Sequence, residues 1–308
     1  MLRHFGMLLV GFAALIVLFV FANPRDVISH MAHAAPSWIA VASGLILVST
    51  LLGACNSYVI TQARGARSFR GFLRGYWVAW AVGLIVPGQI GDVVTLGVFL
   101  RRHGMALPAS LGRVGTDKLI SLFCSLLVAS QLYRLGPQSW LQFAAGVAGI
   151  LAAAMLALFY GMRWLPVVRA SADRRRFLEL IVGALREARA LVVEKPQIVA
   201  FNVALSLLKI GVTGLSYVAV LRAIVATVPD AASVTIAAIG AGLVAYLPLS
   251  ANGIGLVEAA GVNAFAPLGL GISAVLAMYV ILRFLNLLLA WLPVGLTLIG
   301  ETWTRQPK

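Results

Sequence analysis

The chain has 308 residues and a formal net charge of +14, from 24 Lys and Arg against 10 Asp and Glu. Hydrophobic residues make up 61% of it and charged residues 11%, whereas an ordinary soluble domain carries about 25% charged residues. So few charged side chains cannot cover the surface of a water-soluble protein of this size, and that class is excluded.

Apolar runs recur along the whole chain and predict membrane-spanning helices, because crossing a hydrocarbon core of ~30 Å takes about 20 helical residues. The six clearest runs are Phe5–Ala22, Ser37–Gln62, Gly115–Tyr133, Trp140–Met162, Ile198–Val220 and Ile272–Ile299. The first is longer than the ~7–15-residue apolar core of a signal peptide, which favours an uncleaved anchor. The sequence therefore predicts an all-α, polytopic membrane protein, with residues 1–308 forming one transmembrane domain.

Two further apolar regions, Gly75–Leu100 and Ala231–Leu270, are each interrupted by a cluster of Pro and Gly, which break helices. The arms of the first region have 12 and 10 residues. At about 1.5 Å per residue each arm reaches only halfway across a membrane, which predicts a re-entrant hairpin. The arms of the second region have about 17 residues each, so this region is either a re-entrant hairpin or two tilted crossings.

Basic residues indicate the orientation, because Lys and Arg of short loops stay on the cytoplasmic side. Arginines flank the first interrupted region on both sides, and eight Lys and Arg lie in the loop 163–195. Placing all of them inside makes the first hairpin enter from the cytoplasm, the second enter from the opposite face, and both termini cytoplasmic. Similar breaks of opposite orientation indicate inverted repeats, which place a binding site near the middle of the membrane.

Residues 174–195 predict an amphipathic helix, because their apolar residues recur at helical spacing opposite basic ones. Such a helix lies on the inner leaflet and is attracted to anionic lipids, as are the arginines of the segment 64–74. The positive charge thus indicates topology and lipid contact. Nucleic acid is not an expected partner, because the basic residues lie in short loops between spans.

Six ionisable residues fall at membrane depth, where charges are costly and face the protein interior or a wet cavity. They are Asp92, Asp117, Lys118, Lys209, Glu258 and Arg283. Three are acidic and three basic, so they either form buried pairs that fix helix register or line a substrate site. We expect Glu258 to lie within interaction distance of Arg283 or Lys209, since an isolated carboxylate there would become protonated.

The breaks themselves are candidate binding elements, because a new half-helix presents unpaired backbone N–H groups and the positive end of its dipole. At membrane depth only water, protein or a polar ligand can satisfy those groups. The candidate substrate-binding residues at the breaks, in addition to the ionisable ones, are Pro87, Gly88, Gly91, Ser250, Asn252, Gly253 and Gly255.

Signatures of enzymes are absent from the sequence. It contains no Gly-Lys pair, hence no Walker A loop, and no His-Glu-x-x-His or Cys-x-x-Cys motif. Its two cysteines, Cys55 and Cys124, lie about 70 residues apart in apolar runs. The sequence therefore predicts neither a cofactor nor a metal nor an ATPase of its own, and favours a protein that is not an enzyme.

Both breaks resemble motifs of the flippase-like transmembrane family, which includes the membrane portion of lysylphosphatidylglycerol synthases. Residues 87–92 resemble its Pro-Gly-x-x-Gly-Glu motif, and residues 247–258 resemble its Pro-x-Ser-Pro-Gly-Gly-x-Gly-x-x-Glu motif. The order of elements is similar over nearly the whole chain. Asp92 stands where the family usually has Glu, Asp117-Lys118 replaces Glu-Arg, and Thr95 stands where an Arg is common. These departures bear on which lipid headgroup the protein binds rather than on its fold.

The resemblance implies a lipid translocator that moves a lipid with a polar or anionic headgroup between leaflets, through a polar cavity open sideways to the bilayer. It also implies a stand-alone member, because only nine residues follow Ile299. The expected location is a bacterial inner membrane. The alternatives are an accessory subunit that binds a lipid or glycan synthase, and a transporter of small solutes or ions. A homo-oligomer is compatible with each of them.

The predicted topology can be tested by cysteine labelling. With Cys55 and Cys124 replaced, cysteines introduced at Arg70 and Arg102 should both react with an impermeant maleimide only from the cytoplasmic face. A cysteine at position 102 that reacts only from the outer face would exclude the re-entrant first hairpin.

Overall fold

The structure, a computed structural model, describes residues 13–61, 68–86, 90–136, 171–247 and 250–304. Within these ranges every regular element is a helix, which confirms the predicted all-α polytopic membrane protein. The predicted span Trp140–Met162, the first residues of the span Phe5–Ala22, and the site residues Pro87 and Gly88 lie outside the described residues.

Within the described ranges, four helices are long and apolar enough to cross a membrane: α3 (Pro36–Thr61), α6 (Leu107–Ala129, continued by the 3-10 helix η2, Ser130–Leu135), α9 (Pro196–Ile224) and α12 (Ile272–Thr304). They coincide with four of the predicted spans. Helices α6 and α9 each have Pro within their first two positions, where a missing N–H costs no hydrogen bond.

The described end of the first predicted span is sharply bent. A helix over Ala13–Phe21 meets α2 (Pro24–Ala32) at 89°, so the pair is a broken span or a re-entrant loop. Asn23 forms the corner with a positive φ of 55°, and its side chain accepts a hydrogen bond from the N–H of Arg25.

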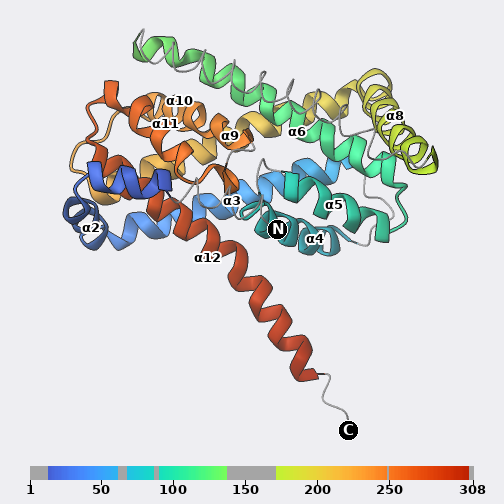
Figure 1. Cartoon of the computed structure of the whole chain (residues 1–308), viewed down its shortest axis with the longest axis horizontal. Helices are drawn as coiled ribbons and strands as arrows, with labels where there is room; N and C mark the ends of the chain where they lie inside the picture. The colour runs from blue at the N-terminus through green and yellow to red at the C-terminus, as the bar shows by residue number, and fades with distance from the viewer. Residues whose placement is uncertain (1–12, 62–67, 87–89, 137–170, 248–249, 305–308) are drawn as a thin grey trace.

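The first interrupted region folds as a helical hairpin of α4 (Phe69–Gly83) and α5 (Ile90–Arg102), which lie side by side (Figure 1). Gly75 allows this close approach, because a Cβ there would meet the ring of Phe99. The helices have 15 and 13 residues, so they are ~22 and ~20 Å long and too short to cross a membrane. The predicted break is confirmed, and entry from the cytoplasm stays a prediction.

The second interrupted region also contains two short helices, α10 (Ala231–Gly242) and α11 (Leu256–Phe265). The 3-10 helices η3 (Leu243–Tyr246) and η5 (Ala266–Leu268) extend them, and η4 (Ala251–Gly253) lies in the break. With these extensions the arms run over Ala231–Tyr246 and Leu256–Leu268, which are 16 and 13 residues. Both are shorter than the ~20 residues of a full crossing, which favours the re-entrant hairpin over two tilted crossings.

Left-handed backbone builds the second break. Asn252, Gly253 and Gly255 have φ values of 44°, 70° and 79°. A Cβ on Gly253 would lie 2.5 Å from Cγ2 of Val257, so this position needs glycine for space as well as for conformation. The turn directs the chain into α11 within a few residues.

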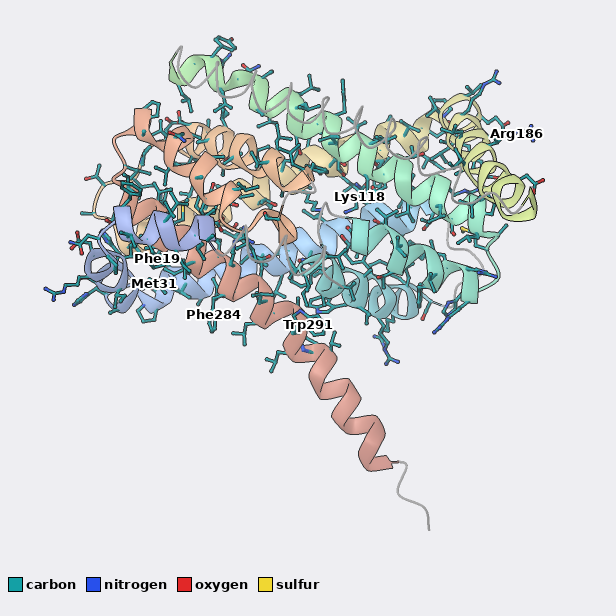
Figure 2. All side chains as sticks on the ribbon, viewed as in Figure 1. Phe19, Met31, Lys118, Arg186, Phe284 and Trp291 are labelled. Carbon is teal, nitrogen blue, oxygen red and sulfur yellow. The ribbon has the colours of Figure 1, made fainter. Side chains whose placement is uncertain are left out.

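The amphipathic helix predicted over residues 174–195 matches α8 (Ser171–Glu194), which packs against α6. Gly112 of α6 lies against the backbone of Ala184, and Gly183 of α8 lies against Pro108. Figure 2 shows Arg186 on the outward side of α8. The position of α8 on a membrane surface stays a prediction.

The two largest apolar clusters among the described residues hold most of the helices together. The larger joins α3, α9, α10, α11 and α12, and contains Phe265, Met278 and Tyr279. The smaller joins α4, α5 and α6, and contains Phe72, Leu96 and Val114. Each of these clusters is therefore built around one of the two hairpins.

A side-chain hydrogen bond links the first hairpin to the last helix. Pro293 lies inside α12 and has no N–H to donate to the carbonyl of Leu289. The indole Nε1 of Trp77, on α4, donates to that carbonyl oxygen instead, at 3.3 Å. Trp77 of α4 thus satisfies the carbonyl of Leu289, which Pro293 leaves without a backbone donor.

Large apolar side chains cover the outer surface of the long helices, among them Leu119, Phe123, Phe201, Phe284 and Leu292. Phe284 and Trp291 point outward from α12 (Figure 2). In water this exposure would be unfavourable, whereas acyl chains solvate such a surface at no cost.

Gly214 on α9 is a test of this packing, because a Cβ there would overlap the side chain of Thr235 on α10. Gly214→Ala should lower the free energy of unfolding by about 1–3 kcal/mol, as overpacked core positions do. Thermal unfolding of the purified protein in mild detergent measures it. The matched control is Gly211→Ala on the same helix, where no atom lies within 4 Å and better helix propensity should add up to ~1 kcal/mol. Equal melting temperatures for the two variants would contradict the described contact of α9 with α10.

Candidate functional site

A cavity of about 530 Å³ lies between the two apolar clusters. Its wall takes Leu96 and Val114 from the smaller cluster, and Ile46, Val257 and Leu282 from the larger. The volume is within the ~300–1,000 Å³ range of small-molecule sites. Its polar lining residues are Ser49, Thr50, Ser57, Tyr76, Asp92, Lys118, Lys209, Thr213, Ser216, Tyr217, Asn252, Tyr279, Arg283 and Asn286.

One ion pair ties the first hairpin to a long helix at the cavity wall. Lys118 of α6 binds Oδ2 of Asp92, which lies in the first turn of α5. The other carboxylate oxygen of Asp92 accepts a hydrogen bond of 2.8 Å from the N–H of Val93. This N–H is among those that a helix start leaves without an intrahelical partner, and a negative charge there is favoured by the helix dipole.

A second ion pair ties the second hairpin to another long helix in the same way. Nε of Arg283, on α12, donates to Oε1 of Glu258, which lies in the first turn of α11. Oε2 of Glu258 accepts a hydrogen bond of 2.7 Å from the N–H of Gly255. The expected pairing of Glu258 is confirmed. The side chain of Glu258 is 1% exposed and lies behind Arg283, which lines the cavity.

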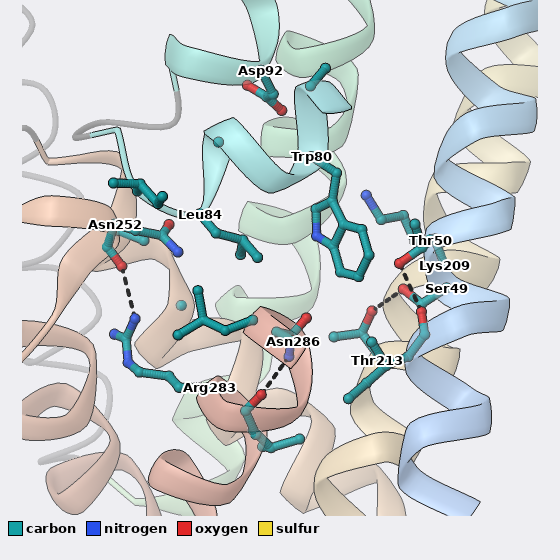
Figure 3. A pocket seen from close by; sticks show the side chains of 18 of the residues that line it. Ser49, Thr50, Trp80, Leu84, Asp92, Lys209, Thr213, Asn252, Arg283 and Asn286 are labelled. Carbon is teal, nitrogen blue, oxygen red and sulfur yellow. Dashed lines mark hydrogen bonds between the residues drawn. The ribbon is translucent and has the colours of Figure 1, made fainter. Parts of the chain in front are cut away.

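Arg283 also reaches the break itself. Its Nη1 donates to the backbone oxygen of Asn252 at 3.4 Å, so the guanidinium bridges the left-handed turn and the carboxylate at the start of α11. Figure 3 shows this contact on one side of the cavity.

Lys209 of α9 lies on the opposite wall, next to Ser49, Thr50 and Thr213 (Figure 3). Among the described residues it makes neither an ion pair nor a hydrogen bond. Three cations and one anion line the cavity, and Asp92 is already paired with Lys118. Arg283 is likewise paired with Glu258, so Lys209 is the cation of the wall that has no ion-pair partner among the described residues.

The predicted site residues divide into two groups. Asp92, Lys118, Lys209, Asn252 and Arg283 line the cavity. Gly91, Asp117, Ser250, Gly253, Gly255 and Glu258 do not line it: the glycines shape the breaks, and the other three side chains are buried.

The sequence analysis did not identify most of the neutral polar residues of the cavity. They form stripes at helical spacing, which is the signal that could have found them. On α9 the stripe at the cavity is Lys209, Thr213 and Ser216, and on α12 it is Tyr279, Arg283 and Asn286. Ser49 of α3 and Thr213 of α9 share a hydrogen bond of 2.8 Å.

These features define a polytopic helical membrane protein with a polar cavity, lined by charged residues, between two broken helical hairpins. The chain belongs to the lysylphosphatidylglycerol synthase TM region family, whose model matches residues 7–294. This shows the membership that the motifs at the two breaks predicted.

The chain is also similar to a glycosyltransferase, AglD, of the archaeon Haloferax volcanii. The two are 27% identical over 116 residues, which are 37% of this chain and 19% of that protein. The matched part thus covers about a fifth of the curated relative.

The pair of Glu258 and Arg283 can be tested by a double-mutant cycle in detergent. Glu258→Gln should destabilise the protein by up to about 3–5 kcal/mol, because it leaves a largely buried cation unpaired. Arg283→Gln should be similarly costly, and the double variant should recover part of the loss. Strictly additive effects on the free energy of unfolding would show that the two side chains are not coupled.

Proposed function

We propose that the protein translocates a lipid with an anionic headgroup between the leaflets of the membrane, without an ATPase of its own. The observation that carries this proposal is the cavity, where the starts of two broken helices are fixed by ion pairs around an unpaired lysine. Membership of the family supports a role at the membrane, and the transport activity itself is our inference.

The barrier to lipid translocation is the cost of moving a charged headgroup through hydrocarbon. A cavity within the membrane lowers this barrier if fixed polar groups of the protein replace the water around the headgroup. Here the hydroxyls of Ser49, Thr213 and three tyrosines, with the amide of Asn286, provide such groups, while Lys209 and Arg283 provide positive charge from opposite walls.

The two ion pairs have a different role in this proposal. Each pair neutralises a carboxylate that lies just after a helix break, and it fixes that hairpin to a long helix of the cavity wall. Lys209 makes no ion pair within the described residues, so its ammonium group can contact a headgroup anion. We further propose that both termini are cytoplasmic and that the membrane is the inner membrane.

One observation favours a second candidate function. The curated relative is named as a glycosyltransferase and shares only a segment of 116 residues with this chain. A chain of this kind could serve as the membrane subunit of a lipid or glycan synthase without transporting anything. Stable co-purification with such an enzyme, together with no leaflet exchange by the pure protein, would support that function.

Lys209 provides the sharpest test of translocation. The purified protein is reconstituted into liposomes, and leaflet exchange is measured with fluorescent analogues of phosphatidylglycerol and of a neutral glycolipid, without nucleotide. Lys209→Met should slow exchange of the anionic analogue by about 10–100-fold, since a hydrogen bond to a charged group contributes about 1.5–3 kcal/mol. Lys209→Arg should retain most of the rate.

The control is Arg186→Met, which removes a cation from the exposed surface of α8 and should leave the rate unchanged. Equal rates for the unmodified protein and Lys209→Met would contradict a headgroup contact at this residue. Exchange no faster than in protein-free liposomes would contradict translocation altogether.

A further inference from the structure

A second polar site lies outside the cavity, where α3, α6 and α9 pack against one another. Its centre is Asp117 of α6, which is 5% exposed. Around it lie Asn56 and Ser57 of α3 and Asn202 and Ser206 of α9, each at most 3% exposed. Five polar side chains are thus buried together between helices whose outer faces are apolar.

Hydrogen bonds connect all five. Asn202 and Asn56 donate their Nδ2 groups to Oδ1 of Asp117, at 2.8 and 3.1 Å, and Ser57 donates to Oδ2 at 2.7 Å. Asn56 also donates to Oγ of Ser206, at 3.0 Å. Every donor to the carboxylate is neutral, and within the described ranges no cation lies within ion-pair distance of Asp117.

The two asparagines leave their other ends unsatisfied. The Oδ1 atoms of Asn56 and Asn202 are buried and have no hydrogen-bond partner among the described residues. Each unsatisfied oxygen therefore belongs to an amide whose nitrogen contacts the carboxylate of Asp117. A buried acceptor without a partner costs about 1–3 kcal/mol, and here two occur on side chains that contact a carboxylate with no ion-pair partner among the described residues.

We propose that these residues form a binding site for Na⁺. The ligands are a carboxylate oxygen of Asp117, the Oδ1 atoms of Asn56 and Asn202, and the hydroxyls of Ser57 and Ser206. Hard cations prefer such oxygen donors. Rotation of the two carboxamides about χ2 would exchange their N–H groups for their oxygens at the ion, so that one ion satisfies both carbonyls and the charge.

The charge of the site selects a monovalent ion. One carboxylate neutralises Na⁺, whereas a divalent ion would leave a net positive charge in a low-dielectric interior. A proton on Asp117 would also remove the charge, but it could donate to only one of the two asparagine oxygens. Sodium satisfies both.

The site communicates with the cavity through one side chain. Ser57 donates to Asp117 and also lines the cavity, so an ion can enter through the cavity, past Ser57. The presence of the ion does not depend on what the cavity transports, and binding is therefore tested apart from lipid exchange.

The test uses the full chain in mild detergent at constant ionic strength, with choline chloride replaced stepwise by NaCl. The thermal unfolding temperature should rise with Na⁺ and then saturate, because an ion that binds only the folded state stabilises it. Asp117→Asn should abolish the rise, and Ser57→Ala should weaken the apparent affinity for Na⁺ at least about tenfold.

Ser43→Ala is the matched control, because Ser43 lies on the same helix and bonds only the carbonyl of Ile39. It should leave the Na⁺ dependence intact. If Asp117→Asn does not fold, the Ser57→Ala titration alone decides. An unfolding temperature equal in NaCl and choline chloride, or one that changes with pH but not with Na⁺, would overturn the proposal.

Discussion

The structure depends on one constraint: a helix that stops inside a membrane leaves backbone groups and charges that only the protein can satisfy. Both hairpins satisfy these groups in the same way. A carboxylate in the first turn of the helix after the break accepts a backbone N–H and binds a cation from a long helix, as Asp92 does with Lys118 and Glu258 with Arg283. The breaks are thereby fixed to the long helices.

The same constraint explains where the cavity forms. Each hairpin organises its own apolar cluster, and polar groups at the breaks cannot enter either cluster without partners. They collect at the boundary, where α9 and α12 turn their polar stripes inward. The cavity is thus a consequence of building one protein around two interrupted elements, and it places the cations of three different helices, α6, α9 and α12, around one space.

Several features could be predicted from the sequence because they follow from local rules. Apolar length predicted α3, α6, α9 and α12, and Pro and Gly predicted both breaks. The cost of an isolated carboxylate predicted the pairing of Glu258. The partners of Asp117 were missed because Asn and Ser within apolar runs alter hydropathy little, and which of them meet depends on how three helices are rotated. The first arm of the second hairpin, Ala231–Tyr246, has close to its predicted length, whereas the second, Leu256–Leu268, is shorter because left-handed backbone at Gly255 and Gly269 bounds it.

The hydrogen bond between Trp77 and Leu289 joins the first hairpin to the last helix. Between α3 and α9 the walls are joined by extensive packing and by the contact of Ser49 with Thr213. Between α4 and α12 the described side chains contribute this one hydrogen bond, made to a carbonyl that Pro293 has already freed from the helix ladder. Breaking it leaves the remaining backbone bonds of both helices intact. The boundary of α4 and α12 can therefore part at this bond without unwinding either helix.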